Sequence, residues 1–399
     1  MKLALVADVF PPLRSSGAVQ LRDLSNDLVS QGHEVTVLVA SPLLDAPYQL
    51  EVLGGLKVLR LKTPATKDRG YVARTLGEFW MPFVMLQRLQ HSSLSKEVWD
   101  AVVWYSPSIF LGPLVKAIKS KSCCPSYLIV RDIFPEWAAD MGLMSRGLPF
   151  LFFKLIAAYQ YSIADVIGIQ SRGNAVYFKR WDESSNRRLE VLHNWLAPAR
   201  DVGCTIDISQ TALAGRKIFV YAGNMGVAQG MDVVVDLAQF FKNDRNVGFV
   251  LVGRGSEIDK LKSMVAQKAL ENVLFFEEID PGEIPSLYAQ CDVGLVLLDA
   301  RHRSHNVPGK FLTYMQAGLP VLAAVNAGND LIGLIDESQV GRACEATDLN
   351  KLFASAKELL AQIQSDNCYC QRCQALCERL FTAEAAARQV VASLKWAQN

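Results

Sequence analysis

Short apolar runs alternate along the chain with longer segments that are apolar at every third or fourth position. The short runs have the length of strands buried on both faces, and the longer segments have the period of amphipathic helices. Strands connected by helices form parallel sheets, so the pattern predicts an α/β protein. In the first half, the expected strands are residues 3–7, 34–39, 101–104, 127–130, 165–169 and 189–192.

A polar segment without clear periodicity separates this series from a second one. The second series predicts strands at residues 218–221, 247–252, 273–276, 293–297 and 320–324, and helices towards the end of the chain at 349–364 and 367–398. We therefore expect two Rossmann-like domains whose parallel sheets face a cleft. Their expected bounds are 1–198 for the first domain, 199–215 for a linker, 216–380 for the second domain and 381–399 for a helix that returns to the first.

Composition agrees with a folded protein of this size. The chain has 399 residues, which is too many for one ordinary core. Of these residues 50% are apolar and 20% are charged, a composition typical of globular domains. Basic residues exceed acidic ones in the first half and the reverse holds in the second, either by chance or because the first half meets an anionic partner.

Nine cysteines suit a reducing compartment, and those at 368, 370, 373 and 377 are either packed thiols or a metal site. The apolar start ends at Asp8 and Pro11, too early for a secretory signal, so we expect a cytoplasmic protein.

Glycine-containing turns follow several of the predicted strands, at the sheet edge where α/β proteins bind ligands. After the first strand, Gly17 would let the backbone approach a ligand, or would simply make a tight connection. In the second half, Gly223, Asn224, Gly226 and Gln229 form a turn before a helix, whose free N–H groups can hold a diphosphate. The next strand ends in Gly253 and Arg254, and Lys310 follows Pro308-Gly309 at a later helix start. Both cations can pair with phosphate oxygens.

Four strings of residues resemble those of family 4 glycosyltransferases, which have the GT-B fold. They are Tyr105-Ser106-Pro107-Ser108-Ile109-Phe110, Arg131-Asp132-Ile133-Phe134-Pro135-Glu136, Gly223-Asn224-Met225-Gly226 with Gln229-Gly230, and Pro308-Gly309-Lys310. Together they are similar to bacterial O-antigen and capsule enzymes, in particular to N-acetyl-L-fucosamine transferases. The resemblance covers nearly the whole chain and implies an acceptor domain followed by a nucleotide-sugar domain.

The resemblance also implies roles for individual residues. Arg254, Lys310 and the turn amides would stabilise the charge on a departing diphosphate, while Asp132 would contact the acceptor hydroxyl or the sugar. Phe311, Leu312 and Thr313 would complete the nucleotide-sugar site.

The sequence departs from the family pattern at several of these positions. Arg131 stands where the family has a catalytic histidine, and would hold Asp132 in place, touch phosphate or form a structural ion pair with Asp132. His305 and Thr313 replace two glutamates, of which the second normally binds the ribose. Asn224 and Gln229 replace a frequent arginine and lysine in the glycine-rich turn.

The partners implied are a UDP-sugar donor and a sugar acceptor carried on undecaprenyl diphosphate, with no nucleic acid. Such enzymes act on the inner face of the cytoplasmic membrane, need no metal or other cofactor, and usually retain the anomeric configuration. The sequence has no Asp-x-Asp motif to suggest a metal. Two apolar stretches, 79–86 and 148–156, with Lys116, Lys119, Lys121, Arg146 and Lys154, would dock a membrane or form buried helices.

Two other classes of protein fit the same pattern. A sugar-nucleotide epimerase of the same fold would interconvert a UDP-sugar without an acceptor. A non-catalytic protein with a vestigial site would bind UDP without turning it over. Transfer from donor to acceptor with release of UDP distinguishes a transferase from both.

Overall fold

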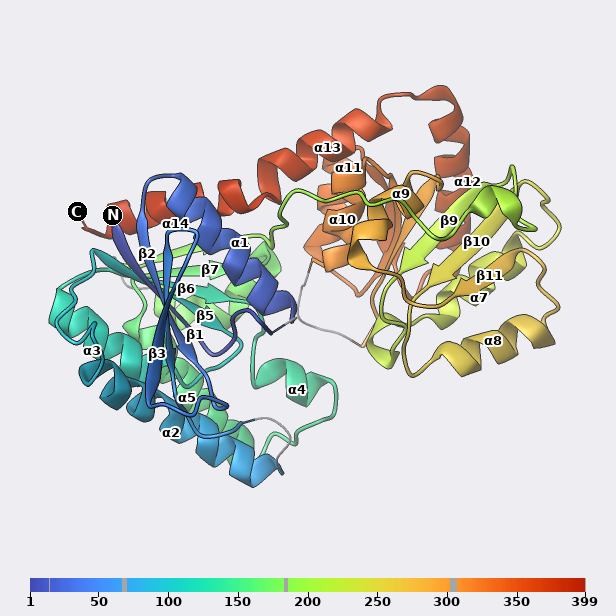
Figure 1. Ribbon diagram of the computed structural model, residues 1–399. Coiled ribbons are helices and arrows are strands. Elements are labelled where there is room, and N and C mark those ends of the chain that lie inside the picture. Colours follow the sequence, from blue (N-terminus) through green and yellow to red (C-terminus); the bar gives the residue numbers. More distant parts are fainter. Residues whose placement is uncertain (14, 67–69, 183–185, 302–306, 399) are drawn as a thin grey trace. The chain divides into compact units, whose positions relative to one another are not determined.

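A computed structural model describes residues 1–13, 15–66, 70–182, 186–301 and 307–398 of the chain. The chain forms two compact units, one made of Met1–Ala197 with Ala383–Asn399 and the other of Pro198–Thr382. Each unit has a sheet with helices on both faces (Figure 1). The predicted fold class, two α/β domains with parallel sheets, is confirmed, with one antiparallel strand as an exception.

The sheet of the first unit has eight strands in the order β3-β4-β2-β1-β5-β6-β7-β8. All neighbours pair in parallel except β3 and β4, which form a hairpin across Gly54 and Gly55, both with positive φ. The strand bounds are β1 (Lys2–Ala7), β2 (Glu34–Ala40), β3 (Tyr48–Leu53), β4 (Leu56–Leu61), β5 (Ala101–Ser106), β6 (Ser126–Val130), β7 (Val166–Ile169) and β8 (Arg188–Val191).

Helices bury the two faces of this sheet in two separate hydrophobic cores. Because neighbouring residues of a strand point to opposite faces, Leu3 and Leu5 of β1 pack with α1 and α14, and Ala4 and Val6 pack with α2 and α3. Figure 1 shows α2, α3 and α5 along one face. The helix bounds are α1 (Ser16–Ser30), α2 (Tyr71–Gln90), α3 (Gly112–Ser122), α4 (Glu136–Asp140), α5 (Leu148–Ile163), α6 (Lys179–Asp182) and α14 (Ala383–Gln398).

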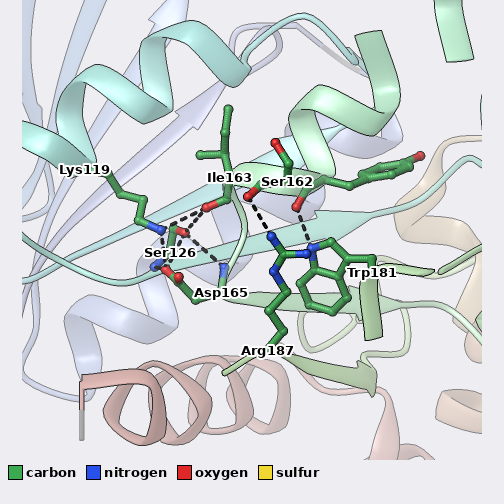
Figure 2. Close-up of polar contacts among 8 residues, drawn as sticks. Lys119, Ser126, Ser162, Ile163, Asp165, Trp181 and Arg187 are labelled. Atoms are coloured by element: carbon green, nitrogen blue, oxygen red, sulfur yellow. Dashed lines mark hydrogen bonds and ion pairs between the residues drawn. The ribbon is translucent and has the colours of Figure 1, made fainter. Parts of the chain in front are cut away.

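Polar side chains fasten the amino-terminal ends of β6 and β7, at the sheet edge opposite to the predicted site (Figure 2). Asp165 Oδ2 accepts hydrogen bonds from Lys119 Nζ at 2.7 Å and from the Ser126 hydroxyl at 2.8 Å. Lys119 Nζ also donates to the Ile163 carbonyl at 2.9 Å. This network holds the start of β6 against the end of α5, which is a structural role.

The second unit has six parallel strands in the order β11-β10-β9-β12-β13-β14. One core joins the sheet to α7, α8 and α12, and α10 packs on α13 and β12. The strands are β9 (Lys217–Ala222), β10 (Val247–Val252), β11 (Val273–Phe276), β12 (Val293–Leu297), β13 (Val321–Val325) and β14 (Gly341–Glu345). The helices are α7 (Asp232–Phe240), α8 (Ile258–Gln267), α9 (Ile284–Tyr288), α10 (Gly309–Ala317), α11 (Asp330–Ser338), α12 (Leu349–Ser365) and α13 (Tyr369–Leu380).

The segment 199–215, predicted as a linker, packs on the second unit and belongs to it. Ile206, Ile208 and Leu213 are buried, and the Ile208 N–H donates to Gln290 Oε1 at 2.9 Å. These three buried side chains anchor the segment, which the lack of periodicity concealed. At the other boundary, α14 packs against α1 and β6 in the first unit.

Candidate functional site

Two glycine turns of the second unit lie against each other at the carboxyl ends of β9 and β10. Gly223 and Gly253 have φ values of +135° and +138°, which favour glycine. A Cβ on Gly253 would lie 2.1 Å from the Gly223 carbonyl oxygen, and a Cβ on Gly255 would lie 2.2 Å from that of Met225. The Met225 N–H donates to the Arg254 carbonyl at 2.8 Å. Glycine is therefore required here for the two turns to pack together.

Lys310 lies beside the first of these turns, at the start of α10. Its Nζ is 4.5 Å from the centre of the Tyr221 ring, and a Cβ on Gly223 would lie 3.0 Å from the same Nζ. No carboxylate among the described residues forms an ion pair with this ammonium group. Burial alone lowers the pKa of Lys310 from 10.5 to about 8. A half-buried cation at the positive end of a helix is electrostatically unfavourable by itself and attracts an anion.

Arg254 differs from Lys310 because it is exposed and already paired. Its Nε lies 3.1 Å from Glu278 Oε2, and both side chains are more than half exposed. Such a pair contributes little to stability, since water and salt screen it. Arg254 is therefore available to exchange Glu278 for an anionic ligand. Sequence reasoning missed Glu278, which follows β11 with no motif to mark it.

The side chains of Asn224 and Gln229 form hydrogen bonds within the first turn. Gln229 Oε1 accepts from the Gly226 N–H at 3.0 Å and from Asn224 Nδ2 at 3.5 Å. The Tyr221 hydroxyl donates to the Asn224 carbonyl at 2.7 Å. The acceptor of Gln229 is thus used within the turn, and its remaining amide N–H groups are the part suited to an anion.

The structure corrects the prediction for two side chains of α10. Phe311 and Leu312 are completely buried, and Phe311 packs edge-on against Phe381, so these side chains belong to the core. The neighbouring Thr313 is half-buried, and its hydroxyl donates to the Lys310 carbonyl at 2.9 Å. A nucleotide would meet the backbone of this helix start rather than the side chains of Phe311 and Leu312. His305 lies outside the described residues.

In the first unit, Arg131 follows β6 and is buried. Its Nη1 donates to the Leu192 carbonyl at 2.9 Å, and its guanidinium lies 4.6 Å from the centre of the Trp195 ring. Burial lowers the pKa of Arg131, and the nearby Tyr105 opposes that shift. Arg131 therefore connects the loop after β6 to the loop after β8, which is a positioning role.

Asp132 projects from the same loop and has an exposed side chain. No ion pair within 4 Å joins it to Arg131 in the described part of the chain, so the structural ion pair considered from sequence does not form. Surrounding protein partly desolvates the Asp132 carboxylate and raises its pKa, while the charge of Arg131 lowers it.

Gly17 lies in the first turn of α1 and packs under Tyr105. A Cβ on Gly17 would be 3.1 Å from the Tyr105 ring, whose hydroxyl donates to Gln20 Oε1 at 3.2 Å. The lack of a side chain at Gly17 thus lets the Tyr105 ring pack closely against the backbone of α1. Gly17, Tyr105 and Asp132 all lie towards the carboxyl edge of the first sheet.

The two apolar stretches of the first unit, 79–86 and 148–156, lie within α2 and α5, and both helices leave large side chains exposed. On α2 these are Tyr71, Val72, Leu76, Trp80 and Phe83, and on α5 they are Leu148, Leu151, Phe152, Leu155 and Tyr159. Arg146 and Lys154 flank them, each paired with a carboxylate of the α4 helix. Lys119 and Lys121, however, bind protein groups elsewhere, Asp165 and the Ser95 carbonyl, so they do not belong to this surface.

The described residues contain neither a candidate membrane span nor a candidate metal centre. None of the described helices combines the length and hydropathy required to cross a bilayer. Within the same residues, no group of three His, Cys, Asp or Glu side chains is arranged to hold a metal ion.

Known proteins are similar to this chain in the sequence of its second unit and in its fold. Residues 216–362 match the family model described as Glycosyl transferases group 1. The chain is 26% identical over 228 residues to the probable glycosyltransferase WbjE of Pseudomonas aeruginosa, covering 55% of this chain and 56% of that protein. It is 22% identical to the putative colanic acid biosynthesis glycosyl transferase WcaI of Escherichia coli K12, covering 80% and 79%.

Among solved structures, the chain resembles Anabaena HepE in complex with UDP and glucose. The TM-score is 0.65 at 14% identity, and the match covers 98% of this chain and 99% of that one. At this identity the likeness establishes the GT-B fold of two α/β domains.

Proposed function

We propose that this protein, whose second unit matches the glycosyl transferases group 1 family, is a glycosyltransferase that takes a sugar from a UDP donor. The observation that carries the proposal is Lys310, a half-buried ammonium group without a carboxylate partner among the described residues. It lies at the start of α10 beside the Gly223 turn. The amides of Gly223, Met225 and Gly226 already donate to protein acceptors, so the N–H groups offered to a ligand are those of the first turn of α10. A diphosphate is an anion that fits a cation at such a helix start.

The second unit would supply the stabilisation of the leaving group. As the bond between sugar and diphosphate breaks, negative charge grows on the phosphate oxygens. Lys310 would meet that charge as an ammonium group, and Arg254 would leave Glu278 to form two parallel N–H···O bonds. Interactions that strengthen with the developing charge lower the barrier, by about 3–4 kcal/mol for one well-placed donor.

The first unit would position the acceptor. Asp132 has an exposed carboxylate that can accept a hydrogen bond from the acceptor hydroxyl or stabilise positive charge on the departing sugar. Arg131 keeps this carboxylate ionised through its charge and fixes its loop through Leu192 and Trp195. Arg131 acts through Asp132 and touches no substrate in this scheme.

The finer identity rests on the sequence motifs and on the names of the relatives. The strings around Asp132 and Lys310 resemble N-acetyl-L-fucosamine transferases, and WcaI is named for colanic acid biosynthesis. We therefore propose UDP-N-acetyl-L-fucosamine, or a related N-acetylated amino sugar, as donor. The acceptor is a sugar on undecaprenyl diphosphate, in the synthesis of O-antigen or capsule. The apolar surface of α2 and α5 would hold the cytoplasmic enzyme on the inner membrane face.

One assay tests the proposal against its alternatives. The protein is mixed with UDP-N-acetyl-L-fucosamine and a diphosphate-lipid N-acetylglucosamine acceptor, and UDP release and product are measured with and without the acceptor. A transferase releases UDP when the acceptor is present and forms a disaccharide lipid. Conversion of the UDP-sugar into an isomer without acceptor would identify an epimerase, and UDP binding with no turnover of any donor tested would identify a non-catalytic protein.

A further inference from the structure

An apolar pocket of about 230 Å³ lies among α2, α3 and α5 of the first unit. Its walls are Phe79, Phe83, Ile109, Phe110, Pro113, Ile156 and Tyr159, with no charged residue. Phe83 and Tyr159 are 42% and 40% exposed, so the pocket opens onto the exposed apolar surface of α2 and α5. A cavity of ~150 Å³ lined by apolar side chains stays dry and binds benzene, so this pocket is large enough for a longer hydrocarbon segment.

A continuous cluster of aromatic rings connects the pocket to the loop that carries Asp132. The Phe110 ring contacts Phe79 at 6.5 Å and Phe153 at 6.3 Å between centroids, and Phe153 contacts Phe134 at 5.2 Å. Phe134 is two residues after Asp132. The pocket is therefore adjacent to the carboxyl edge of the first sheet, where the acceptor is proposed to bind.

Two cationic side chains, one before α5 and one within it, are paired with Asp140 and Glu136 of α4. Arg146 and Lys154 both lie over the Phe150 ring, at 5.8 and 5.7 Å, and each is more than half exposed. These cations lie beside the helix that follows the Asp132 loop, and the pocket lies farther along α5, at Ile156 and Tyr159. A lipid-linked sugar carries its phosphate between its sugar and its hydrocarbon chain, so this placement suits it, with phosphate replacing the carboxylates on the two exposed cations. Bulk membrane lipid would meet the exposed surface, whereas the pocket offers a single lipid-linked sugar a place for its chain near Asp132.

We propose that this pocket binds the first part of the hydrocarbon chain of the lipid-linked acceptor. The proposal rests on the proposed function for the identity of the acceptor, and it adds a binding site to it. By holding the chain, the pocket places the sugar of the acceptor at a fixed distance from Asp132. The bond-making step itself is unchanged.

The test uses farnesyl diphosphate as a soluble probe and inorganic diphosphate as its reference, with excess UDP present to occupy the second unit. Binding is measured by calorimetry for the wild type, for two pocket variants, Ile156→Trp and Phe83→Asp, and for the control Leu155→Asp. Leu155 lies on the same helix, is more exposed than Phe83 and does not line the pocket. Melting temperatures show whether each variant is folded.

We expect the wild type and Leu155→Asp to bind farnesyl diphosphate at least about tenfold tighter than inorganic diphosphate. A tenfold difference is the gain in affinity expected from burying roughly two methylene groups of the farnesyl chain. Both pocket variants should lose this preference while folded. Equal binding of the two probes by the wild type, or full affinity in Ile156→Trp, overturns the proposal. UDP affinity, measured separately, tests the proposed function: its absence counts against the donor site and leaves the farnesyl comparison valid.

Vesicles of phosphatidylglycerol and phosphatidylcholine test whether the pocket instead binds the acyl chains of bulk lipid. Ile156→Trp should bind these vesicles as the wild type does, because the exposed surface is intact, and Leu155→Asp should bind them less. If Ile156→Trp loses vesicle binding and Leu155→Asp does not, the pocket takes the acyl chains of bulk lipid, and the acceptor proposal is wrong.

Discussion

Replacing Lys310 by methionine should make the protein more stable and, at the same time, a weaker binder of UDP. The two side chains have similar length, but methionine carries no charge into the protein. Lys310 has a pKa lowered to about 8 by burial, with no carboxylate partner in the described part of the chain to compensate. A residue kept for stability would show the opposite behaviour, with the variant less stable.

The size of the effect follows from the pKa. A shift from 10.5 to about 8 corresponds to roughly 3 kcal/mol of unfavourable burial of the charged form. Below pH 8 the lysine is protonated in both the folded and the unfolded state, so the full penalty is present. Between pH 8 and 10.5 the unfolded state binds more protons, so the wild type gains stability relative to the variant as the pH rises. The advantage of Lys310→Met should therefore be greatest near pH 7 and vanish near pH 10.5.

Affinity for UDP should change in the other direction. Losing a charged hydrogen bond of about 1.5–3 kcal/mol weakens binding by roughly 10- to 150-fold at pH 7. Between pH 8 and 9 the wild-type affinity should fall as the ammonium group loses its proton. The variant should not respond in this range, because phosphate loses its last proton near pH ~6 and the uracil ring is still mostly neutral. Urea unfolding and calorimetric titration with UDP, at constant ionic strength, measure both quantities. A variant with a lower free energy of unfolding and unchanged UDP affinity would refute the reasoning.

Four further results are expected. Arg254→Ala should raise the activation free energy of turnover by about 2–4 kcal/mol. Its melting temperature should stay near the wild-type value, because the pair of Arg254 with Glu278 is exposed, and a large drop would contradict this. Asp132→Asn should keep UDP affinity and fold but reduce the rate by ~10²-fold or more; an intact rate per folded molecule would show that the carboxylate does not act on the acceptor. Turnover should survive EDTA, and loss restored by Mg²⁺ or Mn²⁺ would overturn metal independence. Gln160→Met should stabilise the first unit by about 1–3 kcal/mol, since this fully buried amide has no hydrogen-bond partner among the residues that the structure describes, and an unchanged or lower free energy of unfolding would count against it.

The order of strands and helices was predictable wherever strands are apolar on both faces. The strands β1, β5, β6, β10 and β12 are runs of buried residues, and such runs are recognisable without knowing their neighbours. The prediction missed β4 and β14, and it missed β3, whose residues are mostly exposed and which has no apolar run. Its one clear signal was local: Gly54-Gly55, two residues that adopt positive φ in a tight hairpin.

The candidate site was predictable where backbone geometry demands a residue type. Gly223, Gly253 and Lys310 lie together because two turns can pack closely only without side chains, and that requirement is visible as glycine in the sequence. The burial of Phe311 and Leu312 was not predictable, because one turn of a helix presents both its core face and its ligand face within three residues. Nor was the pairing of Arg254 with Glu278, which depends on where β11 ends.

Because α14 belongs to the first unit, the two units cannot finish folding in the order in which they are synthesised. Six apolar residues of α14 cover the face of the first sheet that α1 leaves open: Ala383, Ala386, Ala387, Val390, Val391 and Leu394. The ribosome adds about 5–20 residues per second from the N-terminus, so the second unit, a continuous segment, has all its strands before this helix exists. The first unit to emerge is thus the last to close, and until it does, a nascent chain carries an uncovered apolar sheet that a chaperone must protect or that a neighbouring chain can bind.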